Sequence, residues 1–171
     1  MLMTSRILLS FASLLGLASG LCTSALAQAL LPARELSVAA ATEAALAALS
    51  ECKAKGYTVA VAVTDRSGNV RAMVRGDGGG PHLLEAARRK AYTAASSGSS
   101  TLVWAENLAR GLRAPDPNLV HLDGILIIGG GLPIKTGGEI VGAIGVGGAP
   151  GGNFDDGCAQ AGITAIQGQL R

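Results

Sequence analysis

The chain has 171 residues, a formal net charge of +2 and an apolar fraction of 49%, against only 15% charged residues. This composition is too apolar and too weakly charged for a disordered chain, and its 25 glycines follow no G-X-Y repeat, which also excludes a collagen-like chain. No basic run occurs in the sequence, so we expect no nucleic-acid partner.

The first 27 residues have the three parts of a secretory signal peptide. A short basic start ends at Arg6, an uncharged apolar run covers residues 7–21, and the small-x-small pattern Ala25–Ala27 is typical of a signal peptidase site. We therefore expect cleavage near Ala27 and a periplasmic or secreted protein. The apolar run is shorter than the roughly 20 residues that cross a bilayer, so we expect no permanent membrane span.

Residues 28–35 are expected to form a flexible leader, followed by a single domain over residues 36–171. Ser37 predicts the N-cap of a first helix, whose apolar residues recur at helical spacing up to Cys52. Gly56 is expected to end this helix, because glycine adopts the left-handed backbone conformation easily. The β-branched run 58–64 and the segment 70–74 predict a β-hairpin, since turn-forming residues lie between them.

Small residues distinguish the next part of the chain. Pro81 is suited to the first turn of a helix over residues 83–97, which Gly98 is expected to end. Ala87, Ala91, Ala94 and Ala95 recur at helical spacing. This alanine stripe predicts a close approach of the helix to its packing partner. Thr101 is the expected N-cap of a short helix over residues 102–109.

The remaining segments predict a second hairpin and a last helix. The apolar run 125–128 reads as a strand that continues after three glycines, and residues 140–146 are expected to return beside it. Asn153 or Asp155 is expected to cap a helix from about residue 156 to 167. The order α-β-β-α-α-β-β-α predicts an α/β chain of the α+β kind, with a central antiparallel sheet of two hairpins covered by helices.

Two cysteines, Cys52 and Cys158, remain after the expected cleavage. A pair of cysteines in an exported protein favours a disulfide, and the alternative is two buried thiols. Their spacing does not decide between the two, because a disulfide needs Cα atoms within about 7 Å. We predict a disulfide that joins the first and last helices.

The glycine-rich segments do not match a nucleotide-binding motif. The phosphate-binding loop motif is absent, and residues 145–150 lack the last glycine of the dinucleotide fingerprint. Residues 129–131 and 147–152 are instead expected to lie where another backbone, a ligand or a neighbouring subunit comes close.

His82 is the main candidate for a metal ligand. It follows three glycines and a proline at a helix start, where an imidazole is accessible, although a histidine that merely packs on the loop is the alternative. Arg88, Arg89 and Lys90 form the densest charge cluster; one of them is a candidate for binding a ligand carboxylate, and a solvated helix face is the alternative. No zinc motif is present, and we interpret Asp155 and Asp156 as charges at a helix N-terminus.

Several segments together resemble the GlcG/HbpS-like haem-binding family, which is related to the C-terminal domain of PduO-type proteins. The resemblance runs in order over about residues 36–167 and implies a profilin-like fold, homo-oligomers, and haem binding in some members. The segments that carry it are residues 61–65, 68–69, 75–77, 89–94, 129–134, 138–146 and 155–162.

The resemblance favours a homo-oligomeric protein that binds haem or another tetrapyrrole. In this hypothesis His82 binds the metal, Arg89 or Lys90 lies near the acid groups, and Gly130 and Gly131 contact the cofactor. One alternative is a small-molecule enzyme that uses Asp65 or His82 as acid or base beside a glycine-loop anion cradle. The other is an oligomeric module without catalytic activity.

Overall fold

The computed structural model describes residues 29, 31–112 and 115–171, and residues Ala33–Arg171 form one compact unit. The predicted signal peptide lies outside the described residues. Among the described residues, no helix combines the length and the apolar character that crossing a bilayer requires.

The described elements follow the predicted order, which confirms the α+β class. Four helices and four strands make up the unit, together with two short 3-10 helices at Pro117–His121 and Gln167–Gln169. The helices and strands are α1 (Val38–Ala54), β1 (Ala60–Asp65), β2 (Val70–Arg75), α2 (His82–Ser97), α3 (Thr101–Ala109), β3 (Gly131–Thr136), β4 (Glu139–Gly147) and α4 (Gly152–Ile166).

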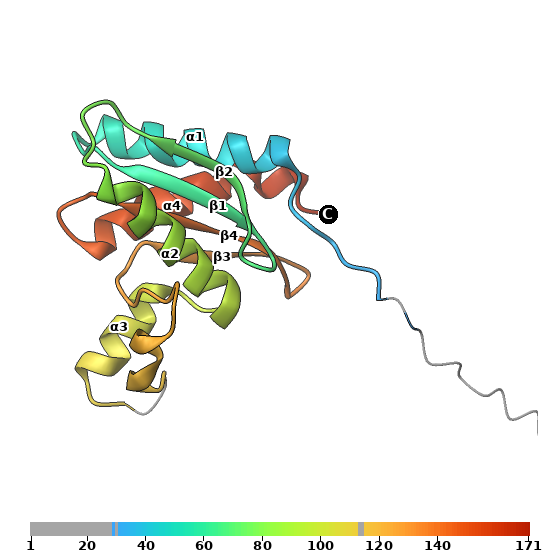
Figure 1. The fold of residues 1–171 in the computed structure, drawn as a ribbon. Coiled ribbons are helices and arrows are strands. Elements are labelled where there is room, and N and C mark those ends of the chain that lie inside the picture. The colour runs from blue at the N-terminus through green and yellow to red at the C-terminus, as the bar shows by residue number, and fades with distance from the viewer. Residues whose placement is uncertain (1–28, 30, 113–114) are drawn as a thin grey trace, which may run out of the picture. The chain divides into compact units, whose positions relative to one another are not determined.

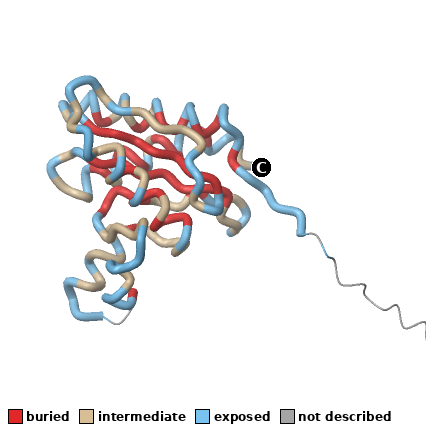
Figure 2. The backbone as a smooth tube through the Cα atoms, viewed as in Figure 1, coloured by how far each residue is buried: buried red, intermediate tan, exposed pale blue. Residues whose placement is uncertain are grey.

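The four strands form one antiparallel sheet in the order β2-β1-β4-β3 (Figure 1). Both predicted hairpins, β1–β2 and β3–β4, are present. They are joined in the middle of the sheet by β1 and β4, whose pairing runs from Ala60 opposite Gly147 to Asp65 opposite Gly142. Strand β1 is buried along its whole length and β4 from Val141 onward, as the red tube in Figure 2 shows.

Helices cover both faces of the sheet. Val61, Val63 and Ile144 pack on one face against α1 and α4, in the larger hydrophobic core. Ala60 and Ala62 point to the other face and pack against the alanine stripe of α2. The alternation of valine and alanine along β1 therefore gives the sheet one thick and one thin apolar layer.

Close packing of α2 on the sheet requires a glycine in β4. A Cβ atom at Gly145 would overlap with the backbone carbonyl of Ala87 in α2. The small side chains on both elements thus bring the helix backbone directly against the strand, as the alanine stripe predicts.

The predicted strand over residues 125–128 is wrong. The Leu126 N–H donates to Thr93 Oγ1 at 2.8 Å, so this segment lies against α2, and strand pairing starts only at Gly131. Ile128 is 51% exposed. The segment therefore lies beside α2 and outside the sheet.

Two predicted helix caps are also wrong. Ser100, and not Thr101, is the N-cap of α3, since its hydroxyl accepts from the N–H groups of Leu102 and Val103. Helix α4 begins after Gly151 without any side-chain cap, so neither Asn153 nor Asp155 has that role. Asp155 belongs to α4 and is buried, and its carboxylate forms an ion pair with Lys90 of α2.

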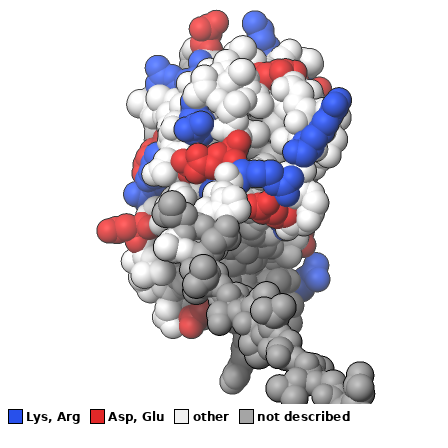
Figure 3. All heavy atoms as spheres, turned by 90° about the vertical axis from the view of Figure 1, so that its right-hand side faces the viewer, with Lys and Arg blue, Asp and Glu red and all other residues white. Residues whose placement is uncertain are grey.

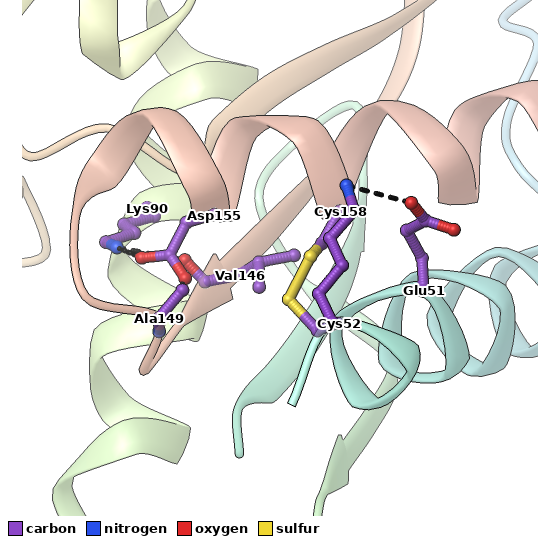
Figure 4. The surroundings of a disulfide bond; sticks show 8 residues. Glu51, Cys52, Lys90, Val146, Ala149, Asp155 and Cys158 are labelled. Carbon is purple, nitrogen blue, oxygen red and sulfur yellow. Dashed lines mark hydrogen bonds and ion pairs between the residues drawn. A yellow bond between two sulfur atoms is a disulfide. The ribbon is translucent and has the colours of Figure 1, made fainter. Parts of the chain in front are cut away.

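The predicted disulfide between Cys52 and Cys158 is confirmed. The two Sγ atoms are 2.04 Å apart and the Cα atoms 5.5 Å apart. The bond links α1 to α4 across 106 residues of sequence, within the thicker layer of the unit (Figure 4).

Candidate functional site

His82 is the first residue of α2 and is exposed, next to a glycine loop that leaves the end of β2. The loop turns through Gly78, whose φ of +77° favours glycine, and the Gly79 N–H donates to the Gly76 carbonyl at 3.0 Å. A Cβ atom at Gly80 would lie 2.7 Å from His82 Cε1, and one at Gly79 would lie 3.1 Å from Arg75 Cγ. The two missing side chains therefore allow an imidazole and an arginine stem to rest on the same short loop.

A hollow of about 190 Å³ lies where this loop meets the end of α1 and the start of β1. Lys53 and Arg75 supply two exposed cations, and Asp77 supplies one carboxylate. Within the part of the chain that the structure describes, neither cation forms an ion pair with an acidic side chain. The hollow is lined by Leu49, Lys53, Tyr57, Thr58, Val59, Arg75, Gly76 and Asp77.

Two of the few aromatic residues meet beside this hollow. Tyr57 lines it, and the Phe154 ring lies 5.6 Å from the Tyr57 ring between centroids, at a tilt of 56°. Phe154 is 43% exposed. The hollow therefore combines cations with an accessible apolar surface, which is the chemistry that an apolar acid requires.

Lys90 lies in a different place, in a buried cluster between α2 and α4. Its ammonium donates to Asp155 Oδ2 at 2.8 Å and to the Val146 carbonyl at 2.9 Å, and both charged side chains are at most 5% exposed (Figure 4). Asp155 Oδ1 also accepts from the Ala149 N–H at 3.0 Å. Burial raises the pKa of the Asp155 carboxyl, and the charge of Lys90 opposes that effect.

The backbone N–H groups of Gly130 and Gly131, the predicted anion cradle, lie beside this cluster. The Gly130 N–H donates to Asp156, and the Gly131 N–H donates to Thr101 Oγ1 at 2.8 Å. Burial raises the pKa of the Asp156 carboxyl, and the Gly130 N–H opposes that effect. These backbone donors thus bind acceptors of the protein itself. Asp155 lies in the first turn of α4, as the sequence predicts, and in addition forms the ion pair with Lys90, which the sequence did not predict.

Close backbone approach accounts for the glycines of these loops. A Cβ atom at Gly130 would overlap with the Val146 carbonyl, and one at Gly131 would overlap with the carbonyl of Lys90. A Cβ atom at Gly129 would lie 2.9 Å from the backbone of Gly152. Of the three partners that the sequence allowed for these segments, the structure places another backbone of the same chain there.

The structure does not gather the predicted site residues in one pocket. Arg89 donates to Glu85 at 2.8 Å on the exposed side of α2. Lys90 is held with Gly130 and Gly131 in the buried cluster, whereas His82 lies at the start of α2 and rests on Gly80. The roles of Arg89, Lys90, Gly130 and Gly131 in ligand binding stay predictions.

Asp65 and His82 lie at opposite ends of β1. The loop before His82 leaves β2 at Arg75, opposite Ala60, whereas Asp65 ends the strand. Six strand residues extend over about 17 Å. Asp65 is also engaged in the hairpin turn, where its carboxylate accepts from the N–H groups of Ser67 and Asn69, both at 2.9 Å. An acid–base pair of these two residues is therefore not supported.

Sequence reasoning missed Lys53, Tyr57 and Arg75 as site residues. Lys53 and Tyr57 lie in no motif, and residues 75–77 contribute only to the family resemblance. The two segments 49–59 and 75–77 must fold together before these residues line one hollow. The exposed cations and anions elsewhere are interspersed, as the face drawn in Figure 3 illustrates, so charge density alone does not reveal the hollow.

These features define a small α+β domain with a candidate site for an apolar, anionic ligand. A family model described as "Haem degrading protein HbpS-like" matches residues 36–164. The chain therefore belongs to the HbpS-like family, which confirms the predicted family, and the haem in the family's description agrees with the predicted cofactor. No curated protein matches the chain.

Solved structures support the assignment. HbpS is 40% identical, with a TM-score of 0.75 over 81% of this chain and 94% of HbpS. A double mutant of HbpS from Streptomyces reticuli is also 40% identical, with a TM-score of 0.74 over 80% of this chain and 90% of that chain. The C-terminal domain PduOC in complex with haem is 23% identical, with a TM-score of 0.70 over 77% of this chain and 95% of that one, and shows the same fold.

Proposed function

We propose that this chain is an exported, homo-oligomeric haem-binding protein in which His82 binds the iron. The observation that carries the proposal is an exposed imidazole on a glycine loop, close to a hollow with two cations that have no ion-pair partner among the described residues. Membership of the HbpS-like family and the haem in the PduOC complex support haem as the ligand.

The residues at this site fit haem in chemical kind. Haem is an apolar macrocycle with two carboxylates and an iron that accepts an imidazole nitrogen. His82 supplies the imidazole, which rests on Gly80, and Tyr57 and Phe154 supply apolar surface. Within the described residues His82 forms no side-chain hydrogen bond, so an imidazole nitrogen is free to bind the iron.

Export agrees with the disulfide, because such bonds persist in oxidising compartments and are rare in the cytosol. Cleavage near Ala27 would release the protein to the periplasm or the medium. Light scattering of the purified protein tests the oligomer: a mass several times that of one chain is expected, and a monomeric mass would contradict this part of the proposal.

Haem titration tests the ligand. Protein purified from cells that express the full chain is titrated with haem, and a shift of the Soret band is expected. His82→Ala should weaken binding at least about tenfold and change the spectrum, because an axial ligand is lost.

His121→Ala is the matched control, because His121 is the only other histidine and is also exposed. It should bind haem as the wild type does. Absence of a Soret shift in the wild type would overturn haem binding, and an unchanged spectrum of His82→Ala would remove His82 as the ligand.

A further inference from the structure

We infer that the hollow beside the His82 loop is the acid-binding subsite of the proposed haem site, with Lys53 and Arg75 receiving the two carboxylates of the ligand. This inference rests on the proposed function and replaces Arg89 and Lys90 as the partners of the acid groups. It follows from the charges at the hollow, from the fixed backbone that carries the two cations, and from the volume of the hollow.

The charges at the hollow are unusual for this protein. Most cations that the structure describes have an acidic partner: Arg34 and Arg66 bind Glu139, Arg88 and Arg89 bind Glu85, and Lys90 binds Asp155. Among the described side chains, Lys53, Arg71 and Arg75 form neither an ion pair nor a side-chain hydrogen bond. Two of these three line the same hollow, where Asp77 is the only carboxylate, which leaves an excess of one positive charge.

Both cations start from well-fixed backbone. Lys53 lies in the last turn of α1 and follows Cys52, which is bonded to α4. Arg75 is the last residue of β2, paired with Ala60, and its stem rests on Gly79. Since the backbone is already fixed, binding of an anion costs only the rotamer freedom of the two side chains.

The size of the hollow limits what it can hold. Pockets that enclose a whole small-molecule ligand have volumes of about 300–1,000 Å³. A hollow of about 190 Å³ therefore suits the acid arms of the ligand and not the entire macrocycle. The ring would then lie outside the hollow, on the exposed side of the His82 imidazole, which itself rests on Gly80.

The test compares haem with haem dimethyl ester, in which both carboxylates are neutralised while the ring and the iron are kept. The wild type should bind haem at least about tenfold more tightly than the diester, because charge-assisted hydrogen bonds are lost with the ester. The double variant Lys53→Gln, Arg75→Gln should bind both compounds equally. Circular dichroism verifies that the variants are folded.

Lys55→Gln is the matched control. Lys55 is an exposed lysine at the same helix end, it is paired with Glu51 at 2.8 Å, and it does not line the hollow. This variant should keep the preference of the wild type for haem over the diester.

The outcomes separate the two proposals. Equal binding of haem and diester by the wild type, with a spectrum that still depends on His82, overturns the acid subsite and leaves haem binding intact. A wild-type preference that survives in the double variant also overturns the subsite. Absence of binding of either compound overturns both proposals.

Discussion

Lys90 and Asp155 form a buried ion pair, with side chains 5% and 4% exposed. Removal of one partner of such a pair leaves an uncompensated charge in the interior, which costs about 3–5 kcal/mol. We therefore expect Lys90→Met to lower the free energy of unfolding by about that amount near neutral pH. Urea denaturation followed by circular dichroism measures the change.

The double variant Lys90→Met, Asp155→Asn is the control for this prediction. It removes both charges and retains a side-chain oxygen that accepts from the Ala149 N–H. Its loss of stability should be clearly smaller than that of Lys90→Met alone, because no lone charge stays buried. A loss below about 1 kcal/mol in the single variant would show that the pair contributes little.

At the scale of elements, the β1–β2 turn depends on the ionised carboxylate of Asp65. Burial by itself would raise the pKa of Asp65, but hydrogen bonds from Asn69 and Ser67 and the charge of Arg71 lower it below 3.8. Since the folded-state pKa is the lower one, the stabilisation is present above the unfolded value and is lost as the pH falls through the folded value.

Asp65→Asn should therefore be less stable than the wild type near pH 7, and the difference should narrow near pH 3. Asparagine keeps an oxygen that accepts from the backbone but carries no charge to titrate. Urea unfolding of both proteins at the two pH values measures the difference, and the other carboxylates cancel in the comparison. A difference that stays constant between the two pH values would contradict the role of the ionised carboxylate.

The elements that could be predicted are those whose signals are local. Ser37 caps α1 as expected, because its hydroxyl accepts from the Ala40 N–H three residues on. Gly98 ends α2 in the left-handed conformation. The prediction of a strand over residues 125–128 is wrong because an apolar segment can lie against a helix or in a sheet. Only its partner, here Thr93 of α2, decides between the two.

The candidate site was predictable only in part, for the same reason. His82 stood out because a glycine-proline loop precedes it. The ion pair of Asp155 was not predicted because its partner Lys90 is 65 residues away, and a carboxylate in the first turn of a helix already has an ordinary local explanation. Lys53 and Arg75 line the same hollow because of how α1 lies against the sheet, and no local sequence pattern predicts that arrangement.

At the scale of the whole chain, the disulfide stabilises the fold and agrees with the predicted export to an oxidising compartment. The bond closes a loop of 106 residues between α1 and α4, and a bond of this kind stabilises a protein by about 2–4 kcal/mol. We expect the double variant Cys52→Ser, Cys158→Ser to lose stability in that range, measured by urea denaturation. Full stability in the double variant would show that the bond constrains the unfolded chain very little.

Thiol counting then tests the disulfide and the cleavage in one experiment. The chain has three cysteines, of which Cys22 lies in the predicted signal peptide. Exported protein should show no alkylatable thiol when it is denatured without reductant and two thiols after reduction, because Cys22 is removed and Cys52 is bonded to Cys158. A third thiol after reduction would show that Cys22 is retained and that cleavage near Ala27 does not occur. Two thiols without reductant would show that Cys52 and Cys158 stay reduced in the exported protein.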